Sequence, residues 1–218
     1  MGFQSEQELV NLFKISYFNK YKIQRKKIFE EVNLGFGIAD LVVSELKNEN
    51  NCINRDKLTY IDINIYQIVK KNKKITFDKV KQISGVRKEE VNKSLKKLVE
   101  YSFIQKVDSC YIFKNKYELS YKKSIAFEAK LRNWKRALMQ AYRYKWFADY
   151  SYVVLDESHS KVAIENLDTF KKLNIGLITL NIKGGIVIHY HPKKQKPLDI
   201  SMQISLSEMI LDTVQNFV

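Results

Sequence analysis

Two kinds of hydrophobic pattern divide this chain, and together they limit the folds that it can adopt. On both sides of a central segment, short apolar runs alternate with stretches that have apolar residues at helical spacing. Such alternation of strands and helices favours an α/β domain with a mixed sheet. The central segment has three helical stretches and then two short strands around Asp108–Ser109. The sequence therefore predicts an α/β core that is interrupted by a smaller α+β domain.

The segments outside the central one predict a helix followed by a mixed sheet. The first two strands meet at Gly35-Phe36-Gly37, which predicts a hairpin. Residues 48–55 are polar and rich in turn-forming residues, which indicates a linker into the central segment. We expect helices over residues 4–18, 134–148 and 162–173, and strands over residues 26–33, 38–46, 124–131, 151–155, 176–181 and 185–191.

The central segment has the element order of a small DNA-binding domain. We expect helices over residues 60–71, 77–84 and 87–101, and strands over residues 104–107 and 111–113. This order resembles a winged helix-turn-helix, which implies that the third helix is the recognition helix. The residues predicted to contact DNA from its polar face are Arg87, Lys88, Asn92, Lys93, Lys96 and Lys97. Three helices with a hairpin are also a common packing arrangement, and winged helices can bind protein instead.

Positive charge is concentrated in the same central region. The chain has a formal net charge of +14, and residues 57–123 hold 17 Lys and Arg against 7 Asp and Glu, a surplus of +10. A surplus of this size is typical of proteins that bind a polyanion, most often nucleic acid and less often an acidic membrane surface. A general bias of the composition toward lysine is the alternative explanation.

Composition excludes several classes of protein. Hydrophobic residues make up 45% and aromatic residues 12% of the 218 positions, which is too apolar for a disordered chain. No apolar run approaches the roughly 20 residues of a membrane helix, so no membrane partner is expected. The first residues are acidic where a signal peptide would be basic, and Cys52 and Cys110 form neither a CxxC metal motif nor a disulfide framework. We therefore expect a cytoplasmic protein.

Three charged residues lie in segments that are otherwise apolar. Glu128 and Lys130 are two residues apart in an expected strand, so both side chains project from the same face. Asp40 is the one charged residue in the run 38–43 and must be solvated, paired or bound to metal, because an unpaired buried charge is costly. If the two strands are neighbours, Asp40 and Glu128 could share a divalent cation, and hard oxygen ligands favour Mg²⁺ or Mn²⁺. Alternation of acid and lysine on a solvated sheet face is the alternative.

These residues resemble the motif of the PD-(D/E)XK nuclease superfamily, which includes many restriction endonucleases and the archaeal Holliday-junction resolvases. The resemblance includes the opening helix, Gly37-Ile-Ala-Asp40, Phe127-Glu128-Ala-Lys130 and the helix behind that strand. It implies a restriction-endonuclease-like core, a mixed β-sheet flanked by helices, over residues 1–55 and 118–218. The inserted winged-helix domain would then occupy residues 56–117.

The resemblance also implies a role for each residue of the site. Asp40, Glu128 and the carbonyl oxygen of Ala129 would hold Mg²⁺ or Mn²⁺, and Lys130 would position or activate the attacking water. Some members carry an acid on the first helix, which would be Glu6 or Glu8. Members related to RecB nucleases have Gln-x-x-x-Tyr on the helix after the motif, which implies that Gln140 and Tyr144 face a bound phosphate. Alternatively, these two side chains only bond to each other.

The sequence thus predicts a Mg²⁺-dependent deoxyribonuclease that hydrolyses phosphodiester bonds and binds DNA through its inserted domain. It departs from the family in the long separation of Asp40 from Glu128 and in Ala39, where proline is usual. One alternative is a non-catalytic DNA-binding or regulatory protein on a nuclease-like scaffold. Another is the nuclease subunit of a restriction, transposition or defence assembly, with the insert bound to a protein partner. Because one site cuts one strand, double-strand cleavage would require a homodimer.

Overall fold

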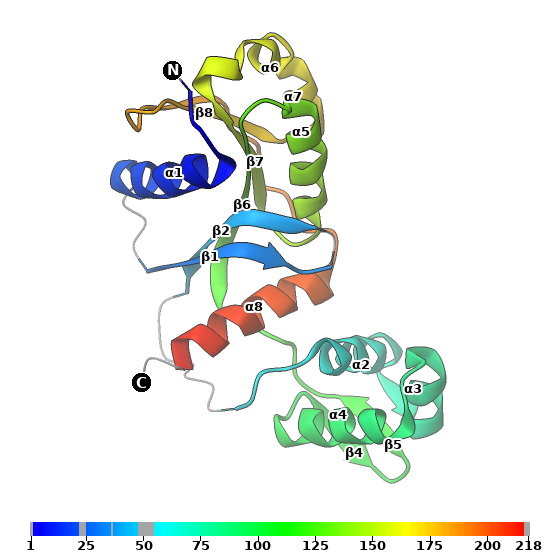
Figure 1. Ribbon diagram of the computed structural model, residues 1–218. Helices are drawn as coiled ribbons and strands as arrows, with labels where there is room; N and C mark the ends of the chain where they lie inside the picture. The colour runs from blue at the N-terminus through cyan, green and yellow to red at the C-terminus, as the bar shows by residue number, and fades with distance from the viewer. Residues whose placement is uncertain (1, 22–24, 36, 48–54, 216–218) are drawn as a thin grey trace. The chain divides into compact units, whose positions relative to one another are not determined.

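The computed structural model describes residues 2–21, 25–35, 37–47 and 55–215 (Figure 1). The chain divides into two compact units, each of which combines segments that are distant in the sequence. Unit 1 comprises Met1–Asn48 and Tyr121–Asp199, and unit 2 comprises Glu49–Ser120 and Ile200–Val218. Both contain helices and strands, which confirms the predicted mixed α/β class. None of the helices described is long and apolar enough to cross a membrane.

Unit 1 is built on a six-stranded mixed sheet with the order β1-β2-β6-β7-β8-β9. The strands are β1 (Lys26–Asn33), β2 (Ile38–Leu46), β6 (Tyr121–Lys130), β7 (Tyr150–Asp156), β8 (Gly176–Leu180) and β9 (Ile186–Tyr190). The pairs β6–β7 and β7–β8 are parallel, and the other neighbours are antiparallel. A strand is present at each predicted position, and β1 and β2 have the predicted ends.

Helices cover both faces of this sheet (Figure 1). On one face lies α1 (Glu6–Lys20), whose Phe13 and Tyr17 rings pack against Phe127 of β6. On the other face, α5 (Trp134–Arg143) contacts β6 and β7 through its buried side. The buried Ala137 and Ala141 have small side chains, which allow this helix to lie close to the strands.

Two helices predicted in unit 1 are interrupted or shortened. The α-helix predicted over 134–148 ends at Arg143 and continues as a 3₁₀ turn, Tyr144–Trp146. The helix predicted over 162–173 is divided into α6 (Lys161–Glu165) and α7 (Leu167–Leu173). Asn166 lies at the division and donates its side-chain amide to the Val162 carbonyl at 2.8 Å. Asparagine side chains compete with the backbone in this way, which weakens a helix at that point.

The turn between β1 and β2 contains the two glycines that predicted a hairpin. Gly35 has φ +104° and Gly37 has φ +120°, a region of backbone conformation that favours glycine. Asn33 stabilises the turn by accepting a hydrogen bond from the Gly35 N–H at 2.9 Å. Phe36 lies outside the described residues, as do residues 48–54 of the expected linker.

Unit 2 contains a three-stranded antiparallel sheet with the order β3-β5-β4. Its elements are α2 (Tyr60–Asn72), β3 (Lys74–Thr76), α3 (Phe77–Ser84), α4 (Lys88–Glu100), β4 (Ile104–Val107), β5 (Cys110–Phe113) and α8 (Ile200–Gln215). The predicted helices and hairpin are present. β3 was not predicted, because three residues are too few to show a strand period and only their pairing with β5 defines them.

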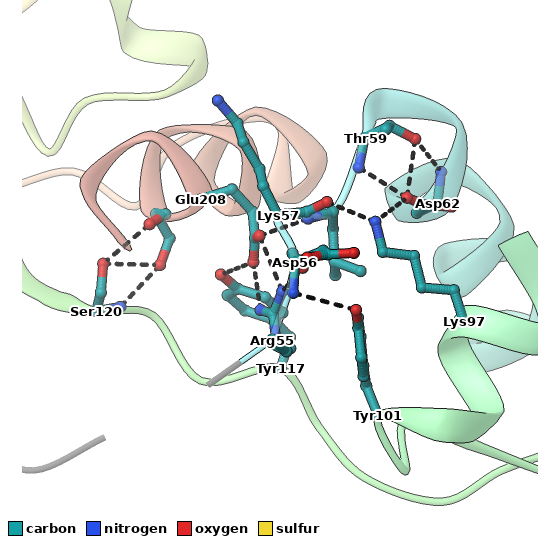
Figure 2. Close-up of polar contacts among 12 residues, drawn as sticks. Arg55, Asp56, Lys57, Thr59, Asp62, Lys97, Tyr101, Tyr117, Ser120 and Glu208 are labelled. Atoms are coloured by element: carbon teal, nitrogen blue, oxygen red, sulfur yellow. Dashed lines mark hydrogen bonds and ion pairs between the residues drawn. The ribbon is translucent and has the colours of Figure 1, made fainter. Parts of the chain in front are cut away.

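The C-terminal helix α8 belongs to unit 2, whereas residues 118–218 were expected to belong to the core, and no helix was predicted over residues 200–215. Ile204 of α8 packs into the apolar cluster formed by α2, α4 and their neighbours. The Glu208 carboxylate accepts hydrogen bonds from both Nη atoms of Arg55 at 2.5 and 3.0 Å, from the Leu58 N–H at 2.7 Å and from the Tyr117 hydroxyl at 2.6 Å (Figure 2). These contacts join residues about 90 to 150 positions apart, so no local sequence pattern shows them.

The residue before Glu208 on the same helix, Ser207, holds the other end of the inserted segment. Ser207 accepts a hydrogen bond from the Ser120 N–H at 2.8 Å, and the two serine hydroxyls are 2.9 Å apart. Arg55 and Leu58 begin the segment and Tyr117 and Ser120 end it, so α8 binds both ends together.

Candidate active site

The β-sheet of unit 1 places the predicted acids and lysine next to one another. On β6, Phe127 and Ala129 point into the apolar cluster beneath α1, so Glu128 and Lys130 project from the opposite face, as predicted from their spacing. Leu41 of β2 pairs with Phe127 of β6. Asp40, one residue before Leu41, therefore lies beside Glu128, and its Oδ2 accepts a hydrogen bond from the Ala129 N–H at 2.7 Å.

Both carboxyl groups are held in surroundings that oppose ionisation. Glu128 has no exposed surface, and burial together with the charge of Asp40 raises the pKa of its carboxyl group. Burial also raises the pKa of Asp40, although the Ala129 N–H and the Lys130 ammonium oppose this effect. Two neighbouring acids, one buried and one half-buried, favour either a proton or an added cation between them.

The Lys130 ammonium lies among oxygen atoms from three residues. Its Nζ is 2.9 Å from Glu6 Oε2, 3.0 Å from Glu128 Oε1 and 3.1 Å from the carbonyl oxygen of Ala129. Burial alone would lower the pKa of Lys130, but the carboxylates of Glu6 and Glu128 raise it, so the ammonium stays charged. One positive charge therefore faces three carboxyl groups, those of Glu6, Asp40 and Glu128.

The first helix offered two candidate acids, and the structure separates them. Glu6 reaches Lys130, as described above. Glu8 instead contributes to the start of α1, where its carboxylate accepts from the Gln4 N–H at 2.9 Å and its own N–H donates to Ser5 Oγ at 3.1 Å. Such side-chain bonds satisfy the free amides at a helix start. Glu8 is therefore committed to the helix end.

Tyr144 contacts Glu128, which differs from the expected orientation toward a bound phosphate. Its buried hydroxyl is hydrogen-bonded to Glu128 Oε2 and, at 2.6 Å, to the Ile38 carbonyl oxygen. One hydroxyl hydrogen can serve only one of these oxygens. A proton on Glu128 would let the acid donate to the tyrosine while the tyrosine donates to Ile38, which agrees with the raised pKa of Glu128.

Gln140 lies one helical turn before Tyr144 on α5. Its Oε1 is buried and has no hydrogen-bond partner among the described residues. The two side chains therefore do not simply bond to each other. The Tyr144 contact could not be read from the sequence, because it depends on the close approach of α5 to β6.

The oxygen atoms around this site are suited to a hard divalent cation. Asp40, Glu128 and the Ala129 carbonyl supply the ligand set that the resemblance implied, and the Lys130 ammonium already makes contacts with two of the three. Oxygen ligands of this kind suit Mg²⁺ or Mn²⁺. Within the described ranges, no group of three or more His, Cys, Asp or Glu side chains is arranged to hold a metal.

The predicted DNA-contacting residues of α4 fall into two classes. Five of them have exposed side chains: Arg87, Lys88, Asn92, Lys93 and Lys96. Lys97 is the exception, because its Nζ donates to the Lys57 carbonyl at 2.6 Å and lies 3.3 Å from Asp62 Oδ2. It is held inside unit 2, and Asp62 is too distant in the sequence for the helical pattern to have shown this pair. The exposed Glu89 and Glu90 reduce the positive charge at the start of the helix.

Comparisons of the chain with protein-family models, with curated proteins and with solved structures each find no match.

Proposed function

We propose that this protein is a metal-dependent DNA endonuclease with the active-site arrangement of the PD-(D/E)XK superfamily. The observation that supports this most is the convergence of Asp40, Glu128 and Lys130, which are up to 90 residues apart in the sequence. The alternative, acids and lysine on a solvated sheet face, does not agree with the full burial of Glu128 or with the raised pKa values of both acids. Perturbed ionisable groups of this kind concentrate at functional sites.

Each residue of the site has a role in this proposal. Asp40, Glu128 and the Ala129 carbonyl would hold Mg²⁺, which when bound supplies an activated water and stabilises charge on the phosphate. Lys130 supports the attacking water or the phosphate with its compact ammonium, and Glu6 holds that ammonium in position. Tyr144 orients Glu128 through its hydroxyl. Second contacts of this type usually set the position of a metal ligand.

Unit 2 supplies DNA affinity in this proposal as a winged-helix module. Its order of helix, strand, two helices and hairpin, with β3 paired to β5, supports that assignment. α4 would be the recognition helix, and its five exposed residues are suited to phosphates and base edges. Lys97 is left out of this surface because of its contacts with Asp62 and Lys57.

The test is cleavage of supercoiled plasmid by the purified chain with Mg²⁺, with Mn²⁺ and with EDTA. We expect cleavage with either metal, none in EDTA, and none by Asp40→Asn. The matched control is Asp168→Asn, which makes the same change at an exposed carboxylate on α7. Cleavage by Asp40→Asn at the rate of this control would overturn the active-site assignment. A wild-type chain that binds DNA but cuts none with either metal would favour the non-catalytic alternative.

A further inference from the structure

Helix α5 and its flanks carry basic residues with no acidic residue among them. Between Glu128 and Asp149 the chain contains six Lys and Arg and no Asp or Glu. Lys130 belongs to the candidate active site, and Lys145 donates to the Leu173 carbonyl at 3.0 Å. The remaining basic residues are exposed: Arg132, Lys135, Arg136 and Arg143. None of these four residues has a role in the proposed function.

The two sides of α5 have different chemistry. Ala137, Leu138 and Ala141 are buried against the sheet. Arg136 and Arg143, seven residues apart and hence on the same side of the helix, face solvent, and neither forms an ion pair with a described residue. Between them lie two exposed apolar side chains, Met139 at 56% and Tyr142 at 38% exposure. The outward face thus combines guanidinium groups with an exposed aromatic ring.

A second basic segment lies beside the end of this helix. The Gln195 N–H donates to the Asp149 carbonyl at 3.1 Å, and the Leu198 N–H donates to the Lys145 carbonyl at 3.1 Å. These bonds hold residues 195–198 against the turn that follows α5. Lys193 and Lys196 are exposed along this stretch and extend the positive surface, whereas the Nζ of Lys194 lies 3.7 Å from Asp149 Oδ1.

We propose that the outward face of α5, defined by Arg132, Lys135, Arg136, Met139, Tyr142 and Arg143, binds the phosphate backbone of a nucleic acid and leads it to the acid–lysine site. The path of the nucleic acid toward the acid–lysine site rests on the proposed function, whereas binding of phosphates to this face follows from its charge. The 3₁₀ turn that continues α5 carries Tyr144, which contacts Glu128, so a backbone bound outside the helix lies close to the site. Arg136 and Arg143 are about 10 Å apart along the helix axis at 1.5 Å per residue. That separation matches about three nucleotides at 3.4 Å each.

The alternative polyanion, an acidic membrane surface, fits this face less well. A helix that lies on a membrane inserts a broad apolar side among the lipids. The broad apolar side of α5 is already buried on the sheet, and Met139 and Tyr142 are the apolar side chains that remain outside. Arginine and an exposed tyrosine are a combination suited to phosphates and stacked bases.

The test uses the full-length chain with Arg87→Ala, Lys93→Ala and Lys96→Ala, so that α4 contributes little to binding. Into this background we would place Arg136→Ala with Arg143→Ala. The matched control is Lys161→Ala with Lys183→Ala, which removes the same charge from two exposed positions of unit 1 on other elements. Affinity for fluorescent single-stranded and duplex oligonucleotides would be measured without divalent metal over a range of salt concentrations. Two lost phosphate contacts should reduce the slope of log K against log salt by about 1.4 to 1.8 units.

A second pair, Arg136→Lys with Arg143→Lys, keeps the charge and should retain most of the slope. The proposal would be overturned if Arg136→Ala with Arg143→Ala gave the same slope as the control, Lys161→Ala with Lys183→Ala. It would also be overturned by an alanine pair that loses binding to anionic phospholipid vesicles while its binding to oligonucleotides is unchanged. The outcome is separate from that of the proposed function. If the wild-type chain cuts no DNA but the alanine pair has a reduced slope, the nuclease proposal fails and the binding surface is supported. If the wild-type chain cuts DNA but the slope is unchanged, the binding surface fails and the nuclease proposal is supported.

Discussion

Glu128 of unit 1 and Glu208 of unit 2 are both buried glutamates with a basic partner, yet their surroundings differ. Glu208 accepts two bonds from the Arg55 guanidinium, one from the Leu58 N–H and one from the Tyr117 hydroxyl. All four donors point at one carboxylate. Glu128 shares the Lys130 ammonium with Glu6 and with the Ala129 carbonyl, and it shares the Tyr144 hydroxyl with Ile38.

The difference separates a structural ion pair from a site that can take a ligand. A buried charge is tolerated when its partners satisfy all of its hydrogen-bonding capacity, as around Glu208. Around Glu128 the acids outnumber the cation, and the pKa values of Asp40 and Glu128 are raised, mainly by burial. A site with this unbalanced charge gains stability from an added proton or metal ion.

The largest effect that we expect comes from removing the contacts of Glu208. Glu208→Ala leaves the Arg55 guanidinium buried beside aromatic rings without its carboxylate, which should lower the free energy of unfolding of unit 2 by about 3 to 5 kcal/mol. Hydrogen exchange of the α2 and α4 amides reports this unit alone. Glu118→Ala, at an exposed position, is the control and should change stability by less than about 0.5 kcal/mol. Equal protection of these amides from exchange in the two variants would show that the contacts of Glu208 do not stabilise unit 2.

At the candidate active site, Tyr144→Phe removes the hydroxyl that contacts Glu128 and keeps the ring. We expect a fall of about 10- to 100-fold in kcat for Mg²⁺-dependent cleavage, the usual effect of losing a group that orients a metal ligand. KM should change little, because the hydroxyl is buried and cannot contact the substrate directly. Tyr60→Phe, the same change on a tyrosine of unit 2 that is 73% exposed, is the control. If both variants cleave at the same rate, Tyr144 has no part in positioning Glu128.

The basic residues at α4 show the same contrast, between a side chain held in an internal ion pair and side chains exposed to solvent. Replacing Arg87, Lys93 and Lys96 by alanine should reduce the salt slope of duplex binding by about 2.7 units, at about 0.9 per phosphate contact. Affinity should fall for all sequences, because phosphate contacts carry no base information. Lys97→Ala should instead destabilise unit 2 and leave the slope unchanged, because Lys97 is bound to Asp62 and Lys57. A slope that responds to Lys97 alone would reverse this assignment.

The smallest effect concerns the dependence of stability on pH. Because burial raises the pKa of Glu128 above its ordinary value of 4.5, the ionised carboxylate opposes folding when no metal is bound. Stability from this group is therefore full below pH 4.5 and is lost as the pH rises through the folded-state pKa. Glu128→Gln should be more stable than the wild type in EDTA at neutral pH, and this advantage should shrink as the pH falls toward 4.5.

Fluorescence of Trp134 and Trp146, both in unit 1, can follow this unfolding in urea. Added Mg²⁺ should stabilise the wild type and have little effect on Glu128→Gln. A wild type that is more stable than the variant at every pH in EDTA would contradict the unbalanced charge at this site.

Much of unit 1 could be predicted from the sequence, because its strands and turns follow from patterns that extend over only a few neighbouring residues. The ends of β1 and β2 follow from apolar runs and two glycines, and the shared face of Glu128 and Lys130 follows from strand alternation. Asp40 could be singled out as a lone acid in an apolar run. Its closeness to Glu128 remained conditional on strand pairing, which the register of β2 and β6 supplies.

Other features required contacts between distant residues. The residues of α8 were assigned to the core and no helix was predicted over them, because an apolar segment can pack on either unit and only the bonds of Glu208 and Ser207 decide between them. Lys97 looked like its neighbours on the helical pattern, because nothing in α4 indicates that Asp62 lies within 3.3 Å. Likewise, the choice between Glu6 and Glu8 depends on which of them reaches Lys130.

The sequence by itself determined the periods of the strands and helices, the positive charge of the central segment and the residue types of the candidate site. Those properties follow from backbone geometry and composition, which act over a few residues. The tertiary structure alone decided which acids share one ammonium, which lysine is committed to an internal pair, and which unit holds the last helix. These are choices among partners that are equally possible locally, and the packing of distant segments selects one of them.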